Sequence, residues 1–458
     1  MTFELRDYQK TLVDAARRSI AGGNRAVLMV APTGAGKTVM AAWMLAQAST
    51  RGRSCWFVVH RRELITQSSR TFDSVGVQHG IISAGFSQTR APVQICGIQT
   101  LTRRIESVPE PDLIMWDEAH HIASESWSKI YSRFPGALHI GLTATPTRLD
   151  GRGLREWFSE MVQGPTTASL ISEGMLSPYR LFAPSQPDMS SAATRAGDYV
   201  TSDVVDAMDR PSITGDAVSH YQRLCAGKRA IVFAASVKHS NHIVEAFRQA
   251  GVTAEHLDGT TEKSERDRTL ARFKSGEVKV VSNVELFGEG FDAPAIEAAI
   301  LLRPTQSTSL YLQQVGRALR TYPGKSEAII LDHAGNCFRH GLPADIRTWS
   351  LDSQPKPKSE RETPAVTVRQ CKQCFAAFSS RLRECPVCQK PVEIQSRKID
   401  EKKGDLEEIA NLEQREKKRE QAGAKTLDQL INLAIARRYK NPRAWAYHVH
   451  AARSRKFG

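Results

Sequence analysis

The sequence predicts an α/β protein with two parallel-sheet domains in tandem, followed by a small metal-binding module and a helical segment. Apolar runs of strand length alternate with helical patterns from residue 25 to about residue 350, which is typical of parallel strands joined by crossover helices. A stretch rich in Ser, Ala and Pro interrupts this alternation near its middle, so the pattern occurs twice. The 458 residues are also enough for about three domains of ~150 residues each.

The candidate strands are short apolar runs that fit strands buried on both faces of a sheet. Those of the first half are residues 26–30, 55–59, 93–96, 113–116 and 138–141. Those of the second half are residues 230–233, 279–281, 298–302 and 328–331. Residues 183–197 are predicted to form an exposed loop between the halves, and residues 352–364 a polar, Pro-interrupted linker.

The composition is that of a soluble globular protein, with 24% charged and 41% hydrophobic residues. No uninterrupted apolar run reaches the ~18 residues that a membrane-spanning helix needs. The first ten residues include Glu4, Arg6 and Asp7 and lack the apolar core of a secretory signal. We therefore expect a cytoplasmic protein without a membrane partner.

The net charge of +14 is concentrated in the C-terminal part of the chain. Residues 351–458 contain 24 basic and 14 acidic residues, which gives this part a net charge of +10. Such a skew favours a polyanionic partner that is reached mainly by the C-terminal part. A solvated basic tail is the alternative, because composition does not separate the two.

A phosphate-binding loop is predicted directly after the first strand. Residues 31–38 read Ala-Pro-Thr-Gly-Ala-Gly-Lys-Thr, and a helical pattern follows them. A glycine-rich turn between a strand and a helix presents backbone N–H groups to phosphate oxygens, and the helix dipole adds to the attraction. In this pattern Lys37 reaches the β and γ phosphates, and the Thr38 hydroxyl binds Mg²⁺. The expected nucleotide-binding residues of the loop are Thr33, Gly34, Ala35, Gly36, Lys37 and Thr38.

An acidic pair follows the fourth apolar run of the first half, where ligands of parallel sheets bind. Asp117 is placed to hold Mg²⁺, directly or through water. Glu118 is the candidate base that orients and deprotonates the attacking water. Alone, the pair would fit a helix cap equally well, but with Lys37 and Thr38 it predicts nucleotide hydrolysis.

These residues resemble the motifs of the superfamily 2 helicases and translocases, and the resemblance covers most of residues 1–350. Residues 6–9 (Arg-Asp-Tyr-Gln) resemble the adenine-reading Q-motif, which implies nucleotide contacts for Arg6 and Gln9. Residues 117–120 resemble a DEAH-type motif II, which implies catalytic roles for Asp117, Glu118 and His120. The resemblance also implies nucleic-acid contacts in motifs Ia, Ib and III, which we assign to Arg61, Arg62, Thr100 and Thr143. In the family, motif III couples hydrolysis to domain movement.

The second half is similar to the remaining helicase motifs. Residues 231–233 resemble motif IV, and residues 256–259 the strand and turn that follow it. Residues 288–292 are similar to motif V, which implies nucleotide contacts for Gly290 and Asp292. Residues 313–320 are similar to motif VI, which implies that Arg317 and Arg320 face the nucleotide across a cleft. An arginine presented to the γ-phosphate stabilises the charge of the transition state. Motif VI usually has a basic residue at the position of Gln314, so that contact is not carried over.

The family resemblance implies two RecA-like domains, which we place at residues 1–165 and 166–350, with a linker at 351–368. Behind the linker, Cys371-x-x-Cys374 and Cys385-x-x-Cys388 are separated by ten residues, which suits a structural Zn²⁺ bound by four thiolates in a ribbon at residues 369–392. Basic residues surround the site, so it is expected to dock on nucleic acid, with a protein-docking ribbon as the alternative. The other four cysteines, Cys55, Cys96, Cys225 and Cys337, are predicted to be ordinary thiols.

Residues 393–458 are predicted to form a charged helix at 399–421 and a basic helical segment from Leu427 onward. The last twenty residues combine cations with aromatic side chains, among them Trp445 and Tyr447. Base stacking beside phosphate-binding cations is one use of such a segment. A small helical unit with Trp445 and Tyr447 in its core is the alternative.

The expected function is that of a nucleic-acid-stimulated ATPase that uses ATP, Mg²⁺ and a structural Zn²⁺ and unwinds or remodels DNA. Residues 141–153 and the cysteine-rich tail resemble bacterial RadD-type repair helicases and their phage relatives, which implies repair, recombination or phage replication in a bacterial cytoplasm. Single-stranded, forked or branched DNA is the expected substrate, RNA is less favoured, and replication or repair proteins are candidate partners. The rival hypotheses are a duplex translocase that does not separate strands and an ATP-switched nucleic-acid-binding adaptor.

Overall fold

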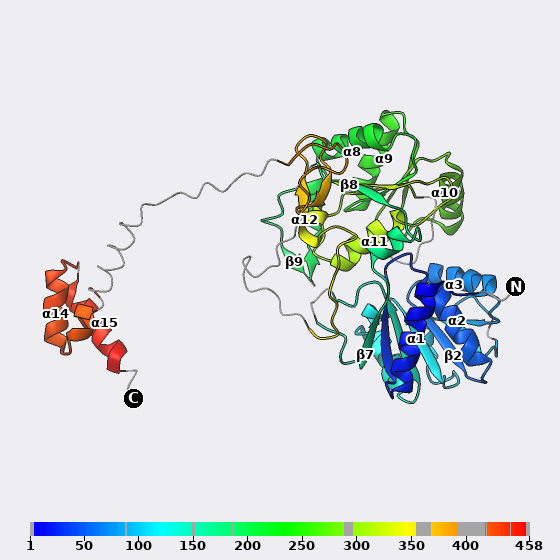
Figure 1. The fold of residues 1–458 in the computed structure, drawn as a ribbon, viewed down its shortest axis with the longest axis horizontal. Helices are drawn as coiled ribbons and strands as arrows, with labels where there is room; N and C mark the ends of the chain where they lie inside the picture. Colours follow the sequence, from blue (N-terminus) through cyan, green and yellow to red (C-terminus); the bar gives the residue numbers. More distant parts are fainter. Residues whose placement is uncertain are drawn as a thin grey trace. The chain divides into compact units, whose positions relative to one another are not determined.

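The computed structural model describes residues 4–87, 89–148, 152–184, 187–195, 197–287, 296–353, 368–392, 417, 419–439 and 441–454. The chain forms two compact units, residues 1–392 and residues 393–458. The first unit contains two lobes, each built on its own parallel sheet (Figure 1). Among the helices of the described ranges, none has the length and apolar character needed to cross a membrane.

Lobe 1 is built on a seven-stranded sheet in which every strand pair is parallel, in the order β3-β4-β2-β5-β6-β1-β7. Its strands are β1 (Ala26–Val30), β2 (Cys55–Val59), β3 (Gly80–Ile82), β4 (Val93–Gly97), β5 (Leu113–Asp117), β6 (Leu138–Thr143) and β7 (Glu160–Gln163). Its helices are α1 (Asp7–Ala21), α2 (Lys37–Ser49), α3 (Arg62–Ser74), α4 (Ile98–Arg103), the 3-10 helix η1 (Ala119–His121) and α5 (Glu125–Arg133).

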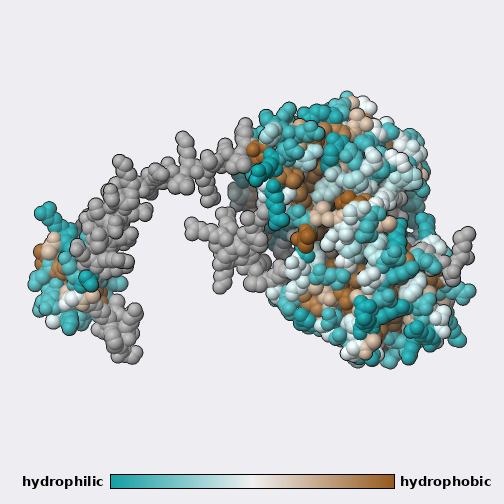
Figure 2. All heavy atoms as spheres, in the orientation of Figure 1, coloured by the Kyte–Doolittle hydropathy of each residue, from teal (hydrophilic) through white to brown (hydrophobic). Residues whose placement is uncertain are grey.

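The sheet of lobe 1 is buried on both faces. Along β1, Val27 and Met29 belong to one buried cluster, whereas Leu28 and Val30 belong to another. Because successive side chains of a strand point to opposite faces, helices must cover both sides of such a sheet. This explains why the central strands are continuous apolar runs. On the face of the molecule in Figure 2, hydrophilic side chains cover most of this unit, and hydrophobic colour is confined to smaller patches.

Lobe 2 is built on a six-stranded sheet, again with parallel pairs throughout, in the order β12-β13-β11-β14-β15-β8. Its strands are β8 (Tyr179–Phe182), β11 (Ala230–Phe233), β12 (Ala254–Leu257), β13 (Val280–Asn283), β14 (Ala298–Leu301) and β15 (Ala328–Asp332), and β9 (Thr194–Arg195) pairs with β10 (Asp198–Tyr199) in a hairpin. Its helices are α7 (Thr201–Met208), α8 (Pro211–Leu224), α9 (Val237–Gln249), α10 (Lys263–Ser275), α11 (Thr308–Ala318) and α12 (Asn336–His340).

The predicted fold class is confirmed, and each of the nine predicted strands is present with ends that differ by at most two residues. The apolar pattern did not reveal β3, β7, β8 and β12, and of these only β12 was expected from the family resemblance, at residues 256–259. β7 lies at the edge of its sheet and is only half-buried, and β3 is three residues long, so neither is a long apolar run. The prediction of an exposed loop at 183–197 is wrong in part. Ala183 is buried, and β9 and β10 form their hairpin from residue 194 onward.

The chain crosses between the lobes twice. The first crossing, residues 164–178, contains the short helix α6 (Thr167–Ser172). The second crossing is residues 341–353, which we call the return segment, because it leaves lobe 2 and packs on lobe 1. Its Leu351 is 3% exposed and lies in the same buried cluster as Leu154 and Phe158 of lobe 1. The first residues of the predicted 351–368 linker therefore pack against lobe 1.

A cysteine-rich ribbon docks on lobe 2. Its strands β16 (Val368–Gln370) and β17 (Ala377–Ser379) are antiparallel. The backbone N–H of Ala183, just past β8, donates to the carbonyl of Phe375 at 3.0 Å, and Gln370 donates to the carbonyl of Ala183. Phe378 of the ribbon is buried in the same cluster as Phe182 of β8. The ribbon is therefore part of the core of lobe 2, and it lies beside β8 and α12 in Figure 1.

The second unit contains the helices α14 (Leu427–Ala436) and α15 (Pro442–Ser454), which confirms helical structure from Leu427 onward. The two helices pack on each other around Leu430 and Ala446. Trp445 contacts this small core, whereas Tyr447 is 60% exposed, so only one of the two aromatic residues fits the packing alternative. Most of the predicted charged helix at 399–421 lies outside the described residues.

Candidate nucleotide site and interlobe contacts

The loop between β1 and α2 has the geometry of a phosphate-binding loop. Gly36 has φ +78° and stands immediately before α2, whose first residue is Lys37. A Cβ atom on Gly36 would lie 2.5 Å from Nε2 of Gln9, so both the backbone conformation and the close approach require glycine. The first N–H groups of α2 have no partners within the helix, as in any helix N-terminus that receives an anion.

Lys37 is buried in this loop with 9% of its surface exposed. Its ammonium donates to the carbonyl of Ala31 at 3.2 Å and of Pro32 at 3.4 Å. Burial lowers the pKa of Lys37, and the nearby carboxylates of Glu118 and Asp117 oppose that shift. A buried ammonium bonded only to neutral carbonyls is well suited to receive an anionic ligand such as a phosphate.

The Q-motif residues lie directly behind the phosphate loop. Gln9 is 4% exposed, and its Nε2 donates to the carbonyl of Ala35 at 3.1 Å. Its Oε1 accepts the backbone N–H of Arg6 at 3.0 Å. Tyr8 donates to the same Ala35 carbonyl at 3.2 Å. Gln9 therefore connects the first turn of α1 to the loop, and the Arg6 side chain is exposed.

The acidic pair lies at the carboxyl end of β5, where Asp117 is 6% exposed. Glu118 is not a glycine, yet it has φ +49° and ψ +53°. Such a conformation costs about 1–3 kcal/mol and occurs mostly at functional sites. Oε2 of Glu118 is buried, accepts no hydrogen bond among the described residues and lies 3.5 Å from Nδ1 of His120. A strained carboxylate with an unsatisfied buried oxygen is suited to hold a water molecule.

A chain of polar contacts runs from the acidic motif across the cleft. Nδ1 of His120 lies 3.2 Å from the hydroxyl of Thr143, which donates to the carbonyl of Thr145 at 2.9 Å. The hydroxyl of Thr145 donates to that of Ser309, on α11 of lobe 2, at 2.6 Å. Thr143 is completely buried, so in this conformation it has no surface for the nucleic-acid contact that the sequence suggested. Its position instead links the acidic motif to lobe 2.

Motif VI forms most of α11, which packs directly on the phosphate loop. A Cβ atom on Gly316 would lie 2.6 Å from Cβ of Thr33, so the helix approaches the loop at a glycine. Arg317 is 4% exposed, and the electrostatic field of Arg317 and Arg320 contributes to the lowered pKa of Lys37. The sequence-predicted residues Asp117, Glu118, Arg317 and Arg320 thus all lie near enough to Lys37 to influence its pKa.

Lys325, which follows motif VI, was not singled out by the sequence. The Lys325 ammonium donates to the carbonyl of Arg320 at 2.7 Å and of Ile296 at 2.8 Å, and also to that of Ala318, which fixes the end of α11. Gln314, where a basic residue is usual, is 3% exposed, and its Oε1 has no hydrogen-bond partner in the described part of the chain.

The nucleotide contacts predicted for motif V, Gly290 and Asp292, lie outside the described residues.

Of the two predicted nucleic-acid residues of motif Ia, Arg61 lies at the interface between the lobes. Arg61 donates to the backbone carbonyl of Glu285 in lobe 2 at 3.0 Å. Glu63 forms an ion pair with Arg266 of α10 at 2.7 Å. Burial opposes ionisation of Glu63, but its hydrogen bonds, including that from Arg266, outweigh this effect and lower its pKa. Arg62 is exposed.

Thr100 of motif Ib is half-buried, and its hydroxyl accepts the backbone N–H of Ala84 at 3.1 Å. Motif Ib therefore lies beside the turn that follows β3. Thr100 keeps part of its surface exposed, so its predicted contact with nucleic acid stays a prediction.

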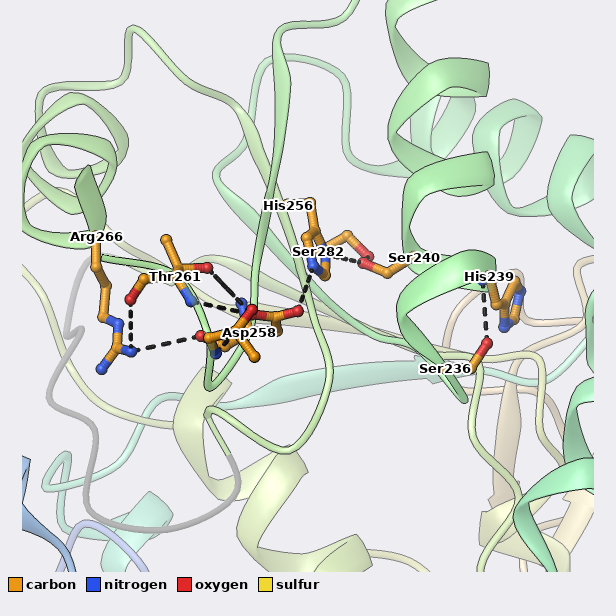
Figure 3. A network of polar contacts seen from close by, with 9 residues as sticks. Ser236, His239, Ser240, His256, Asp258, Thr261, Arg266 and Ser282 are labelled. Atoms are coloured by element: carbon orange, nitrogen blue, oxygen red, sulfur yellow. Dashed lines mark hydrogen bonds and ion pairs between the residues drawn. The ribbon is translucent and has the colours of Figure 1, made fainter. Parts of the chain in front are cut away.

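A polar network in lobe 2 holds Arg266 in place (Figure 3). The Ser240 hydroxyl lies 2.6 Å from Nδ1 of His256, whose Nε2 lies 3.2 Å from the carboxylate of Asp258. Arg266 donates to the carbonyls of Asp258 at 3.4 Å and Thr261 at 3.1 Å. Burial would raise the pKa of Asp258, but hydrogen bonds from Thr260 and His256 lower it to about 2. Ser240 has no exposed surface, so this chain supports the interlobe ion pair and is not a hydrolytic triad.

The four cysteines of the ribbon come together as a candidate metal centre. Their Sγ atoms all lie within 4.8 Å of one another, and the pairs Cys371–Cys388 and Cys374–Cys385 are each 3.6 Å apart. Tetrahedral Zn²⁺ with Zn–S bonds of about 2.3 Å requires sulfur atoms about 3.8 Å apart, so the geometry fits. A bound ion would close the ribbon and supply folding free energy, because this module has little core of its own.

Comparisons with known proteins identify the family. Residues 2–148 match the family described as "Type III restriction enzyme, res subunit", and residues 216–322 match "Helicase conserved C-terminal domain". A "51.5 kDa protein" of a Lactococcus phage is 33% identical over 361 residues, which cover 79% of this chain and 77% of the phage protein. The chain belongs to the superfamily 2 helicases.

Other relatives of this helicase agree with that family. A "Putative ATP-dependent helicase" of Saccharomyces cerevisiae is 28% identical over 356 residues, which cover 72% of this chain but only 51% of the yeast protein. The fold is similar to a fragment of a putative HsdR subunit of a type I restriction enzyme from Vibrio vulnificus. That likeness has a TM-score of 0.57 and 24% identity, and covers 74% of this chain and 67% of the other. The helicase thus has two RecA-like lobes and is an ATP-dependent enzyme that acts on nucleic acids, whereas the RadD-type resemblance stays a prediction.

Proposed function

We propose that this helicase hydrolyses ATP when nucleic acid is bound and uses the energy to unwind or remodel DNA, in repair, recombination or phage replication. The observation that carries the proposal is that α11 of lobe 2, which contains Arg317, packs on the phosphate loop of lobe 1, so that Arg317 and Glu118 both act on Lys37. A site divided between two lobes can link hydrolysis to a change in their positions. A nucleic acid that contacts both lobes would favour the hydrolytic arrangement by shifting the population of conformers.

Each catalytic residue has a proposed role. Lys37 binds the β and γ phosphates, and the Thr38 hydroxyl with Asp117 holds Mg²⁺, which neutralises phosphate charge when bound. Glu118 orients the attacking water and accepts its proton, because its buried Oε2 accepts no hydrogen bond among the described residues. Arg317 and Arg320 stabilise negative charge on the transferred phosphoryl group. An adaptor that only switches with ATP would not need this complete set.

The test is steady-state ATP hydrolysis without nucleic acid and with single-stranded DNA, duplex DNA, forked DNA or RNA. Each measurement is paired with the Glu118→Gln variant, which keeps the size of the side chain but removes the base. Strong stimulation by DNA that is lost in the variant supports the proposal. Equal rates under all conditions would contradict it. Strand displacement on the most stimulating substrate then separates a helicase from a duplex translocase.

A further inference from the structure

The cysteine-rich ribbon has one face that packs on lobe 2 and another that is left to solvent. The packed face is apolar, because Ala376, Phe378 and Cys385 are buried in the cluster that contains Phe182. A backbone hydrogen bond from Ala183 to Phe375 and a side-chain hydrogen bond from Gln370 to Ala183 fix this face. The ribbon is therefore held in a set orientation on lobe 2, and its other face is presented to solvent.

The solvent face of the ribbon is strongly basic. Residues 369–392 contain five cations and a single acid, Glu384. The cations that are exposed are Lys372, Arg381, Arg383 and Lys390. A structural zinc site needs no surface cations, and exposed like charges on so small a module repel one another. The exposure of four cations on this small module therefore indicates a polyanionic ligand.

The turn after β17 carries two of these exposed cations. The backbone N–H of Leu382 donates to the carbonyl of Ser379 at 3.1 Å, and that of Arg381 contacts the Ser379 hydroxyl at 3.4 Å. This turn exposes three consecutive side chains, Arg381, Leu382 and Arg383. Leu382 is 45% exposed between two arginines and is one of few large apolar side chains so exposed in the described chain. An apolar tip between two guanidinium groups fits a ligand that offers both phosphates and the flat faces of bases or sugars.

We propose that residues 381–383 form a nucleic-acid contact, with Arg381 and Arg383 on backbone phosphates and Leu382 against a base or sugar. The inference rests on the proposed function only in taking nucleic acid as the polyanion. Because the ribbon is fixed to lobe 2, this contact moves with lobe 2 when the lobes change position. It would thus hold nucleic acid at a point outside the helicase motifs.

The test is binding of the full-length protein to fluorescently labelled single-stranded, duplex and forked DNA at several KCl concentrations, without ATP. The Arg381→Gln/Arg383→Gln variant should weaken binding roughly 25- to 60-fold at 0.1 M salt. It should also lower the slope of log Kd against log salt by about 1.4 to 1.8, because two phosphate contacts are lost. Leu382→Ala should weaken binding without changing that slope. The matched control is Arg51→Gln/Lys274→Gln, which removes the same charge from exposed positions elsewhere in the unit.

Zinc content and basal ATP hydrolysis of each variant show that the fold is intact. An affinity and a slope equal to those of the control would overturn the proposal. Equal loss of binding to DNA and to polyglutamate would also overturn it, because the face would then be a general polyanion or protein-docking surface. Stimulation of the wild-type ATPase by DNA is measured separately, because it tests the proposed function and not the ribbon contact. Its absence would contradict the proposed function, whereas a normal stimulation with an unchanged slope would contradict only the ribbon contact.

Discussion

The docking of the return segment on lobe 1 gives a sharp prediction for Gly153→Ala. A Cβ atom on Gly153 would overlap the carbonyl oxygen of Leu351 and lie 2.5 Å from the carbonyl carbon of Asp352. Both obstacles are backbone atoms, so the segment must move away. It would then lose the burial of the Leu351 side chain, about 1.5–3 kcal/mol. It would also lose two hydrogen bonds to the Leu351 carbonyl, from Leu154 at 2.7 Å and Arg155 at 3.0 Å, each about 0.5–1.5 kcal/mol.

These contributions suggest a local cost of about 3 kcal/mol, which corresponds to roughly 100-fold in the population of the undocked form. Hydrogen exchange measures the population of the undocked form, because the amides of Leu154 and Arg155 are protected only while the return segment is docked. Exchange at both amides should accelerate about 100-fold in Gly153→Ala. Gly136→Ala is the control, because a Cβ atom there meets nothing within 4 Å. Unchanged exchange at these amides in Gly153→Ala would refute the docking.

Three further outcomes are expected. Lys37→Ala should abolish ATP hydrolysis, measured as phosphate release, because no other buried cation of the described phosphate loop replaces its charge; full activity would contradict the site. Arg266→Gln and Glu63→Gln should weaken nucleic-acid stimulation of the ATPase, with a coupling of about 1 kcal/mol in the double-mutant cycle, and additive effects would show that the pair is not formed. Cys371→Ser should release zinc and lower the thermal midpoint, and metal content equal to wild type would exclude the four-thiolate site.

The sequence was sufficient for the strands that are buried on both faces, because their apolar runs are long and uninterrupted. It was insufficient for β7, whose Glu160–Gln163 segment is half-buried at a sheet edge and carries charge. The role of Leu351 was equally hidden, because a single leucine beside a polar, Pro-containing stretch resembles a linker. Only the position of Gly153 and Leu154 in space shows that this leucine completes the core of lobe 1.

The motifs predict the chemistry of the nucleotide site but not the contacts that connect its parts. Lys37 and Glu118 could be assigned because phosphate binding and water activation demand particular side chains at particular spacings. Thr143 was assigned to nucleic acid by resemblance, and the motif did not indicate its complete burial or its contacts with His120 and Thr145. Ser309 and Lys325 carry no motif signal, because a hydroxyl or an ammonium that positions a helix can occur at many sequence positions.

The position of Arg317 relative to Lys37 depends on contacts that involve neither residue. Gly316 sets how closely α11 approaches the phosphate loop at Thr33. The Thr145–Ser309 hydrogen bond fixes the first turn of the same helix to motif III of lobe 1. A substitution at any of these contacts would move the arginine without removing a charged group from the site. Catalysis should therefore be sensitive to residues that a motif search passes over, because they set the orientation of the helix that carries Arg317.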